Sequence, residues 1–335
     1  MAPALRLSVL DQSPVHAGGT AGEAVAETLA LARLADELGY HRYWLAEHHN
    51  LPAFAGTSPE VLLARLGAET RRIRIGSGGV MLTNYSPLKV AESFRVLEAL
   101  YPGRIDLGVG RAPGGDHATT LLLRDGTTAN LERFPNRVAE LFHLVRGGKL
   151  EVPGIGLVQA NPQGTSAPEL WLLGSSDRSA AYAAHFGCAF SFAHFISQEG
   201  GPAVMAAYRT AFQASALLER PQGSVCVSVT CAATAAEADR LAASRDLWRL
   251  RRDKGVYGPF PSVEEALAYP YSEAERAHVA EIRRGQIIGA PAGVREQLLA
   301  MAEAHGVDEV VVLTICHDPE ARRQSYRLTA EALGL

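Results

Sequence analysis

Cysteine is scarce in this chain of 335 residues, and its four cysteines stand far apart. Cys188, Cys226, Cys231 and Cys316 form no CxxC pair, so neither the usual spacing of a structural zinc site nor a disulfide framework is present. Isolated cysteines of this kind are typical of small buried side chains in a reducing compartment. We therefore expect the fold to depend on its hydrophobic core, since 47% of the residues are hydrophobic.

Long apolar runs and dense basic clusters are missing as well. No stretch approaches the roughly 20 apolar residues of a membrane-spanning helix, and the first residues do not resemble a signal peptide. With 32 basic against 36 acidic residues, the formal net charge is −4, which gives no basic surface for nucleic acid or anionic membranes. These absences favour a cytoplasmic protein whose partners are small molecules.

Short apolar runs alternate with helical patterns along the chain. The expected strands are residues 5–10, 43–47, 73–80, 105–110, 170–173, 189–193, 225–230 and 309–314. Strands separated by helices predict right-handed parallel crossovers, and eight such units can close into a (β/α)8 TIM barrel. We expect one α/β domain over residues 1–335. Residues 251–288, between the seventh and eighth strands, are polar and contain prolines, which predicts a mobile lid within that domain.

Side chains that could take part in catalysis stand at the end of the second expected strand. The run Tyr43-Trp44-Leu45-Ala46 leads directly into Glu47-His48-His49-Asn50. In a parallel α/β protein the carboxyl ends of the strands face the ligand crevice. Because successive strand residues point to opposite faces, one of the two histidines is expected to be functional and the other structural. A metal site is not indicated, since HExxH spacing and a third ligand are missing, and His194 is only a remote candidate.

Three further loops at the same rim can bind a cofactor. In Gly76-Ser77-Gly78-Gly79, glycines without a Cβ allow a flat ligand to approach the backbone. Arg111 follows the fourth strand, where a guanidinium can bind a phosphate. Gly174-Ser175-Ser176 opens a helix whose free N–H groups favour an anion. A dinucleotide fingerprint is not complete, because after Gly108 and Gly110 the next glycine, Gly114, comes one residue too late for GxGxxG.

These motifs, in this order, resemble those of the bacterial luciferase-like flavin monooxygenases. The resemblance is carried by residues 44–49, 75–80 with Pro87, and 103–111, and residues 11–14 and 171–176 look like its single-chain alkanal-monooxygenase-like branch. It implies a TIM barrel that holds FMN at its C-terminal face. By the same resemblance, His48 is the active-site histidine, and the cofactor-binding residues are Ser77, Gly78, Gly79, Arg111, Gly174, Ser175, Ser176 and Ser179. It also implies a cis peptide bond at Gly78–Gly79 or beside it.

The implied function is that of a monooxygenase that combines O2 and reduced FMN with a small organic substrate. A separate reductase would supply the reduced FMN, and the family suggests a homodimer. Gly110 stands where luciferase has a reactive cysteine, which argues against light emission from a long-chain aldehyde. Two alternatives stay open: a dehydrogenase or reductase that uses a deazaflavin or flavin, and a flavin-binding protein without turnover.

Overall fold

Eight parallel strands close into a barrel in the computed structural model, which describes residues 5–127 and 132–335. Each strand pairs with the next along the chain, and the circle closes through pairing of β8 with β9 and of β11 with β1. The barrel strands are β1 (Arg6–Asp11), β2 (Arg42–Leu45), β3 (Arg74–Met81), β4 (Ile105–Gly110), β7 (Glu169–Gly174), β8 (Ala189–Ala193), β9 (Gly223–Cys231) and β11 (Glu309–Leu313). The predicted TIM barrel is therefore confirmed.

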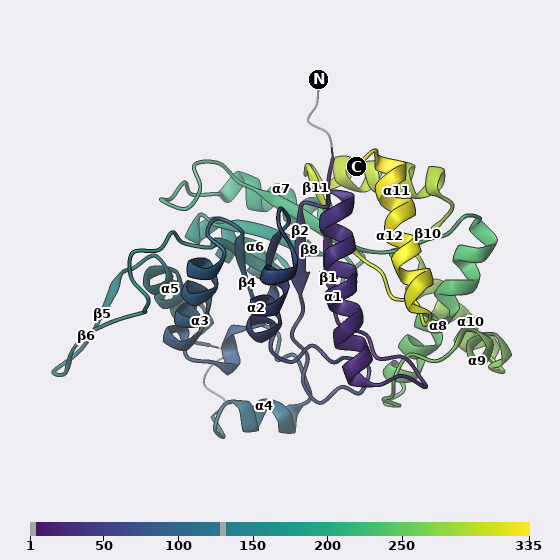
Figure 1. Cartoon of the computed structure of the whole chain (residues 1–335), viewed down its shortest axis with the longest axis horizontal. Helices are drawn as coiled ribbons and strands as arrows, with labels where there is room; N and C mark the ends of the chain where they lie inside the picture. Colours follow the sequence, from purple (N-terminus) through teal and green to yellow (C-terminus); the bar gives the residue numbers. More distant parts are fainter. Residues whose placement is uncertain (1–4, 128–131) are drawn as a thin grey trace.

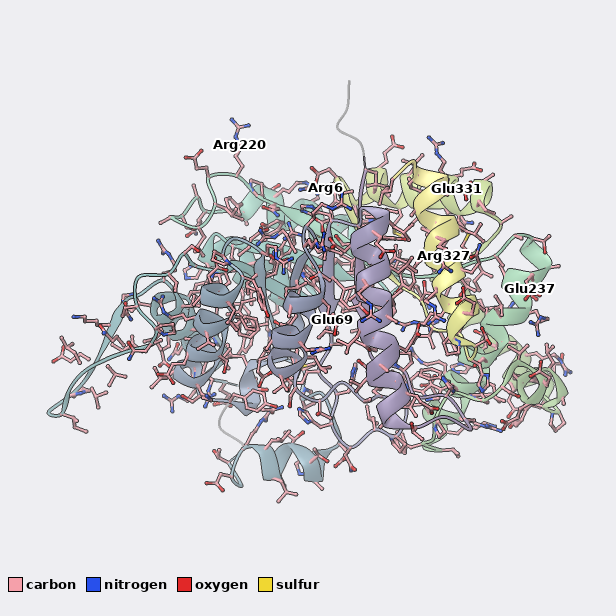
Figure 2. All side chains as sticks on the ribbon, in the orientation of Figure 1. Arg6, Glu69, Arg220, Glu237, Arg327 and Glu331 are labelled. Atoms are coloured by element: carbon pink, nitrogen blue, oxygen red, sulfur yellow. The ribbon has the colours of Figure 1, made fainter. Side chains whose placement is uncertain are left out.

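Helices surround this barrel and bury their apolar faces against it (Figure 1). They are α1 (Ala21–Leu38), α2 (Pro59–Glu69), α3 (Pro87–Leu100), α5 (Phe134–Val145), α6 (Asp177–Phe186), α7 (Gly201–Ala211), α11 (Pro291–His305) and α12 (Pro319–Leu333). Charged side chains of the outer faces, such as Arg327 and Glu331 on α12, point away from the barrel (Figure 2). In the described part of the chain, no helix is both long and apolar enough to cross a membrane.

Two segments differ from what their sequences predict. The glycines and prolines of residues 153–168 predict surface turns, but this region contributes one strand to an antiparallel hairpin, β5 (Lys149–Val152) with β6 (Gly156–Gln159). The apolar spacing of residues 202–217 predicts a helix over that whole range, but α7 ends at Ala211, because the chain then turns back and Gln213 N donates to Ala184 O at 2.9 Å. Neither difference changes the barrel.

The insertion after β9 builds a small structure of its own at the rim. The long helix α8 (Ala235–Asp253) is followed by α9 (Val263–Ala268), α10 (Glu273–Arg283) and β10 (Gln286–Gly289). β11 pairs with the first half of β9, and β10 pairs with its second half. The insertion therefore ends in a strand that continues the sheet along β9, beyond the residues that pair with β11. An apolar cluster joins the insertion to α8, and it contains Leu247, Leu250, Ala266, Tyr269 and Val279. The polarity and prolines of residues 251–288 predict few core contacts, and this apolar cluster shows that prediction to be wrong. The movement of the segment as a lid stays a prediction.

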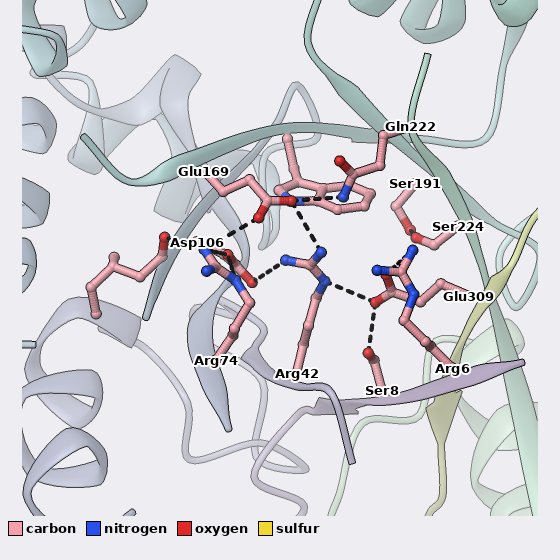
Figure 3. A network of polar contacts seen from close by, with 12 residues as sticks. Arg6, Ser8, Arg42, Arg74, Asp106, Glu169, Ser191, Gln222, Ser224 and Glu309 are labelled. Carbon is pink, nitrogen blue, oxygen red and sulfur yellow. Dashed lines mark hydrogen bonds and ion pairs between the residues drawn. The ribbon is translucent and has the colours of Figure 1, made fainter. Parts of the chain in front are cut away.

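The opposite, N-terminal end of the barrel is closed by charged side chains (Figure 3). Arg42, at the start of β2, is 1% exposed and contacts carboxylates of three other strands: Asp106 at 2.9 Å, Glu169 at 3.0 Å and Glu309 at 2.9 Å. Arg74 adds a second guanidinium at Asp106, 2.6 Å away. Burial alone would lower the pKa of Arg42, but the three carboxylates outweigh it and hold this pKa above its usual range. With this end filled, the C-terminal rim is the open end for a ligand.

Candidate active site

A cavity of about 940 Å³ opens at the C-terminal rim, within the size range of small-molecule and cofactor sites. It brings together eight of the nine residues predicted from the sequence: His48, Gly78, Gly79, Arg111, Gly174, Ser175, Ser176 and Ser179. Ser77 does not line it, because its hydroxyl donates to Gly108 O of the neighbouring strand at 2.8 Å. A smaller hollow of about 500 Å³ lies at the other end of the barrel, near Arg6 and Gly223, and contains none of the predicted residues.

The two histidines after β2 have different surroundings. His49 Nε2 lies 2.8 Å from Glu47 Oε1, and the Tyr85 hydroxyl donates to the same oxygen at 2.8 Å. The other oxygen of Glu47 accepts a hydrogen bond from Met81 N at 3.1 Å, so this buried carboxylate ties the end of β2 to the end of β3. His48 lines the cavity instead, and its ring stacks on Phe54 with centroids 4.5 Å apart. This division agrees with the expectation that one histidine is structural.

His48 is held in its neutral form. Its Nδ1 is buried without a hydrogen-bond partner among the described residues. Burial, followed by the nearby His49 and Arg252, lowers the pKa of His48 to about 4. A neutral imidazole has one nitrogen that donates and one that accepts, so His48 can hold or transfer a proton in the cavity without adding a charge.

This lowered pKa has a consequence for stability. Between about pH 6.5 and 4 the unfolded chain binds a proton at His48 that the folded protein does not, so the free energy of unfolding falls as the pH falls through this window. We expect His48→Gln to lose less stability than the unmodified protein on acidification, measured by urea unfolding at several pH values. The matched control, His117→Gln at an exposed position, should follow the unmodified protein. An acid loss as large in His48→Gln as in the unmodified protein would contradict the assignment.

One wall of the cavity is bare backbone. The Gly78–Gly79 peptide bond is cis, which confirms the prediction, and both residues line the cavity. A Cβ on Gly79 would lie 2.7 Å from Gly108 O and 2.8 Å from a Leu173 methyl group. Only glycine fits there, and it leaves a flat surface without side chains.

The opposite side of the cavity suits an anion. Arg111 is half-buried, and it makes no hydrogen bond or ion pair with any described residue. Ser175 and Ser176 also line the cavity and precede α6, where the first N–H groups lack the i−4 carbonyl partners that later turns of the helix have. Ser179 Oγ donates to Ser176 O at 2.7 Å, and a Cβ on Gly174 would lie 2.3 Å from this Oγ, so the turn requires glycine. A guanidinium without a described partner and a helix N-terminus are two groups that favour a phosphate.

Several lining residues were not predicted from the sequence. Gln12 follows β1, whereas Arg178 and Tyr182 lie on α6 and Phe134 begins α5. Arg178 stands two residues after the predicted Ser176, and this position could have indicated that it lines the cavity. No feature of the nearby sequence indicates the same for Phe134 or Tyr182. His194, the remote candidate, is buried against the His305 ring at 5.8 Å and does not line the cavity. Among the described residues, no group of three His, Cys, Asp or Glu side chains could hold a metal ion, and all four cysteines are buried.

Comparisons with known proteins agree with this geometry. A family model described as luciferase-like monooxygenase matches residues 5–309. The N-acetyl-S-alkylcysteine monooxygenase of Bacillus subtilis (strain 168) is 38% identical over 334 residues, which cover 98% of each chain. A luciferase-like monooxygenase of Escherichia coli (strain K12) is 37% identical over 98% of this chain and 96% of its own. The crystal structure of apo-MsnO8 superposes with a TM-score of 0.91, at 40% identity and with 99% of both chains covered.

Proposed function

This chain belongs to the luciferase-like monooxygenase family, whose members are oxidoreductases, and from this premise we propose that it oxygenates a small organic substrate with O2 and reduced FMN. We infer that the reduced FMN comes from a separate flavin reductase. The observation that carries the proposal is that one cavity is lined both by residues suited to bind an anion and by a neutral histidine.

FMN fits the residues that line this cavity. Arg111 and the N-terminus of α6, with Ser175 and Ser176, would hold the phosphate, because they offer a guanidinium without a partner among the described residues and the positive end of a helix dipole. The backbone at Gly78 and Gly79 would lie against the ring system, since both residues line the cavity and carry no side chain of their own. Ser77 contributes through the strand rather than through its hydroxyl, which Gly108 O already accepts.

Bound reduced flavin supplies the two electrons and the site where O2 is activated. The chain itself has two tasks. Trp44, Leu10 and Phe195 give the inner part of the cavity apolar walls, which exclude water from the reaction. His48 offers a neutral imidazole whose Nδ1 is not already hydrogen-bonded, and it would move a proton or stabilise a developing negative charge.

The relatives narrow the choice of substrate to test. One of them is an N-acetyl-S-alkylcysteine monooxygenase, and the apolar inner walls here suit a substrate with an alkyl or aryl portion. We infer that this chain acts on an organic compound of similar size. The identity of the oxidised atom is part of the test below.

We expect O2 consumption and oxygenated product only when reduced FMN is supplied. The purified protein mixed with FMN and NADPH, without a reductase, should not bleach the flavin, since no strand-turn-helix in the chain carries a complete dinucleotide fingerprint. The measurement is an oxygen electrode with photoreduced FMN and N-acetyl-S-benzylcysteine, followed by mass spectrometry for a gain of one oxygen atom.

Two outcomes would overturn this function, and a third would overturn the inference of a separate reductase. Turnover with a reduced deazaflavin under exclusion of O2 would make the protein a dehydrogenase or reductase. Tight FMN binding without product from any thioether or aromatic probe would leave a flavin-binding protein. Prompt flavin bleaching by NADPH alone would show a nicotinamide site in the chain and would remove the need for a separate reductase.

A further inference from the structure

A glutamine amide just after β1 lies in the cavity without a partner. Gln12 lines the cavity and is only 8% exposed. Its side chain makes no hydrogen bond with any described residue, and neither of its amide atoms is enclosed by protein as Nδ1 of His48 is. The small accessible part of Gln12 therefore includes the amide, which offers two N–H groups and one carbonyl oxygen to a ligand.

The surrounding backbone directs Gln12 into the barrel. Leu10 and Gln12 both line the cavity, whereas Asp11 between them accepts from Arg322 Nη2 of α12 at 2.7 Å, outside the barrel. This is the alternation expected of a strand. Ser13 N donates to Asp11 Oδ1 at 2.8 Å, and this hydrogen bond spans Gln12. The chain on both sides of Gln12 is therefore held in place before a ligand arrives.

Gln12 and His48 lie on the same side of the cavity. β1 pairs with β2 in a parallel register that brings Gln12 beside Ala46, two residues before His48, and all three residues line the cavity. Gly56 is next to both: His48 N donates to Gly56 O at 2.8 Å, and a Cβ on Gly56 would lie 3.6 Å from Gln12 O. One ligand in this cavity can therefore contact Gln12 and His48 together.

The groups that favour an anion lie across the barrel from Gln12. Around the barrel the strands follow in the order β1, β2, β3, β4, β7, β8, β9 and β11, so β7 is the fourth strand from β1 in either direction. Ser175 and Ser176 follow β7, and Arg111 follows the adjacent β4. Among the described residues, the arginine and lysine side chains that line the cavity are Arg111 and Arg178, both on that far side. The part of the cavity beside Gln12 has no such cation.

This part of the cavity suits a neutral polar group better than a charged one. A carboxylate beside Gln12 would lose its water without a cation to replace it, whereas an amide or a carbonyl group loses much less. The nearby walls are apolar, with Leu10 and Trp44 on one side and Phe195 on the other. A wholly apolar ligand would leave the Gln12 amide desolvated without a hydrogen bond, which is unfavourable.

We propose that Gln12 determines substrate specificity by hydrogen-bonding a neutral amide or carbonyl group of the substrate, and so places the atom to be oxidised beside His48. The proposal rests on the proposed function for the reaction itself and for the position of the flavin. A site that hydrogen-bonds a polar group rejects the analogue that lacks this group, because the polar atoms of the site then stay unpaired. The expected substrates therefore carry an amide or carbonyl group close to the oxidised atom.

The test is isothermal titration calorimetry with a matched pair of probes and no reductant. The probes are 2-(benzylsulfanyl)-N-methylacetamide and benzyl butyl sulfide, which has the same chain without the amide. The variant Gln12→Met keeps the size of the side chain and removes its hydrogen-bonding groups. We expect it to lower the preference for the amide, measured as the ratio of the two dissociation constants, by about 5- to 100-fold. Gln297→Met, the same change at an exposed position on α11, should leave this ratio unchanged.

Two further measurements separate substrate binding from a structural or flavin-binding role. Because the Gln12 amide has no partner in the protein, Gln12→Met should unfold at the same temperature as the unmodified protein. It should also bind oxidised FMN with unchanged affinity. In the unmodified protein with oxidised FMN present, the amide probe should bind more tightly than 2-(benzylsulfanyl)acetate, since no lining cation lies beside Gln12. None of these titrations involves turnover, so their failure is distinguishable from failure of the proposed function.

Three results would overturn the proposal. The first is a Gln12→Met variant that binds both probes as the unmodified protein does, or weakens both equally. The second is a loss of FMN affinity in Gln12→Met as large as the loss for the amide probe, because this would make Gln12 a flavin contact. The third is tighter binding of the carboxylate than of the amide by the unmodified protein.

Discussion

Replacing Arg42 with methionine is expected to lower the free energy of unfolding by about 3–5 kcal/mol. Methionine has a similar length but no charge, and it would leave Glu309 and Glu169 buried or half-buried without the cation that they share. It would also expose Asp106 to the repulsion of these two carboxylates, with only Arg74 to oppose it. Urea unfolding at neutral pH measures the change.

Arg33→Met is the control for the loss of an ion pair in itself. Arg33 contacts Glu69 on the outer surface with its side chain 49% exposed, and such pairs contribute at most about 1 kcal/mol. A loss below this amount in Arg42→Met would contradict the view that the network stabilises the barrel. A loss of several kcal/mol would mean that the Arg42 guanidinium stabilises the contact among four strands that are distant in sequence, β2, β4, β7 and β11.

The barrel was predictable because its determinants are local. Each strand is a short apolar run and each helix an apolar pattern at helical spacing, and the alternation of the two leaves few topologies. Only the ends of elements were displaced, as in α7, where a contact with α6 ends the helix earlier than the apolar pattern does.

The buried charges were not predictable because their partners come from distant strands. Arg42 precedes Tyr43 and Trp44 in the sequence, where a charged residue at the start of a strand is typical of the surface. Its partners are more than 60 residues away along the chain, and nothing near Asp106 or Glu309 indicates that they meet. The same reason hides the burial of Arg245, which lies in the polar sequence of α8 and is nevertheless only 8% exposed.

The candidate site was predictable in part. Glycine, serine and arginine next to strand ends marked the loops at the rim, and these residues do line one cavity. The family resemblance selected His48 over His49, and the structure adds that His49 Nε2 already lies within hydrogen-bond distance of Glu47 and Tyr85. In contrast, the rings of Phe54, Trp248 and Phe260 pack on one another from three separate regions of the chain, which no local pattern connects.

The second large effect is expected at Arg111. We expect Arg111→Ala to weaken FMN binding by about 1.5–3 kcal/mol, or roughly one to two decades in affinity, and to leave riboflavin binding nearly unchanged. Only FMN carries a phosphate, and Arg111 lines the cavity with no partner among the described residues to hold it elsewhere. Quenching of flavin fluorescence gives both dissociation constants under the same conditions.

Arg178→Ala distinguishes a specific contact from general attraction. Arg178 also lines the cavity, but it is exposed on the first turn of α6, where solvent screens its charge. Its removal should weaken FMN binding by less than Arg111→Ala does, and added salt should abolish most of that smaller effect. An equal loss of FMN and riboflavin in Arg111→Ala would instead place this guanidinium near the ring system, and the N-terminus of α6 would then have to bind the phosphate without it.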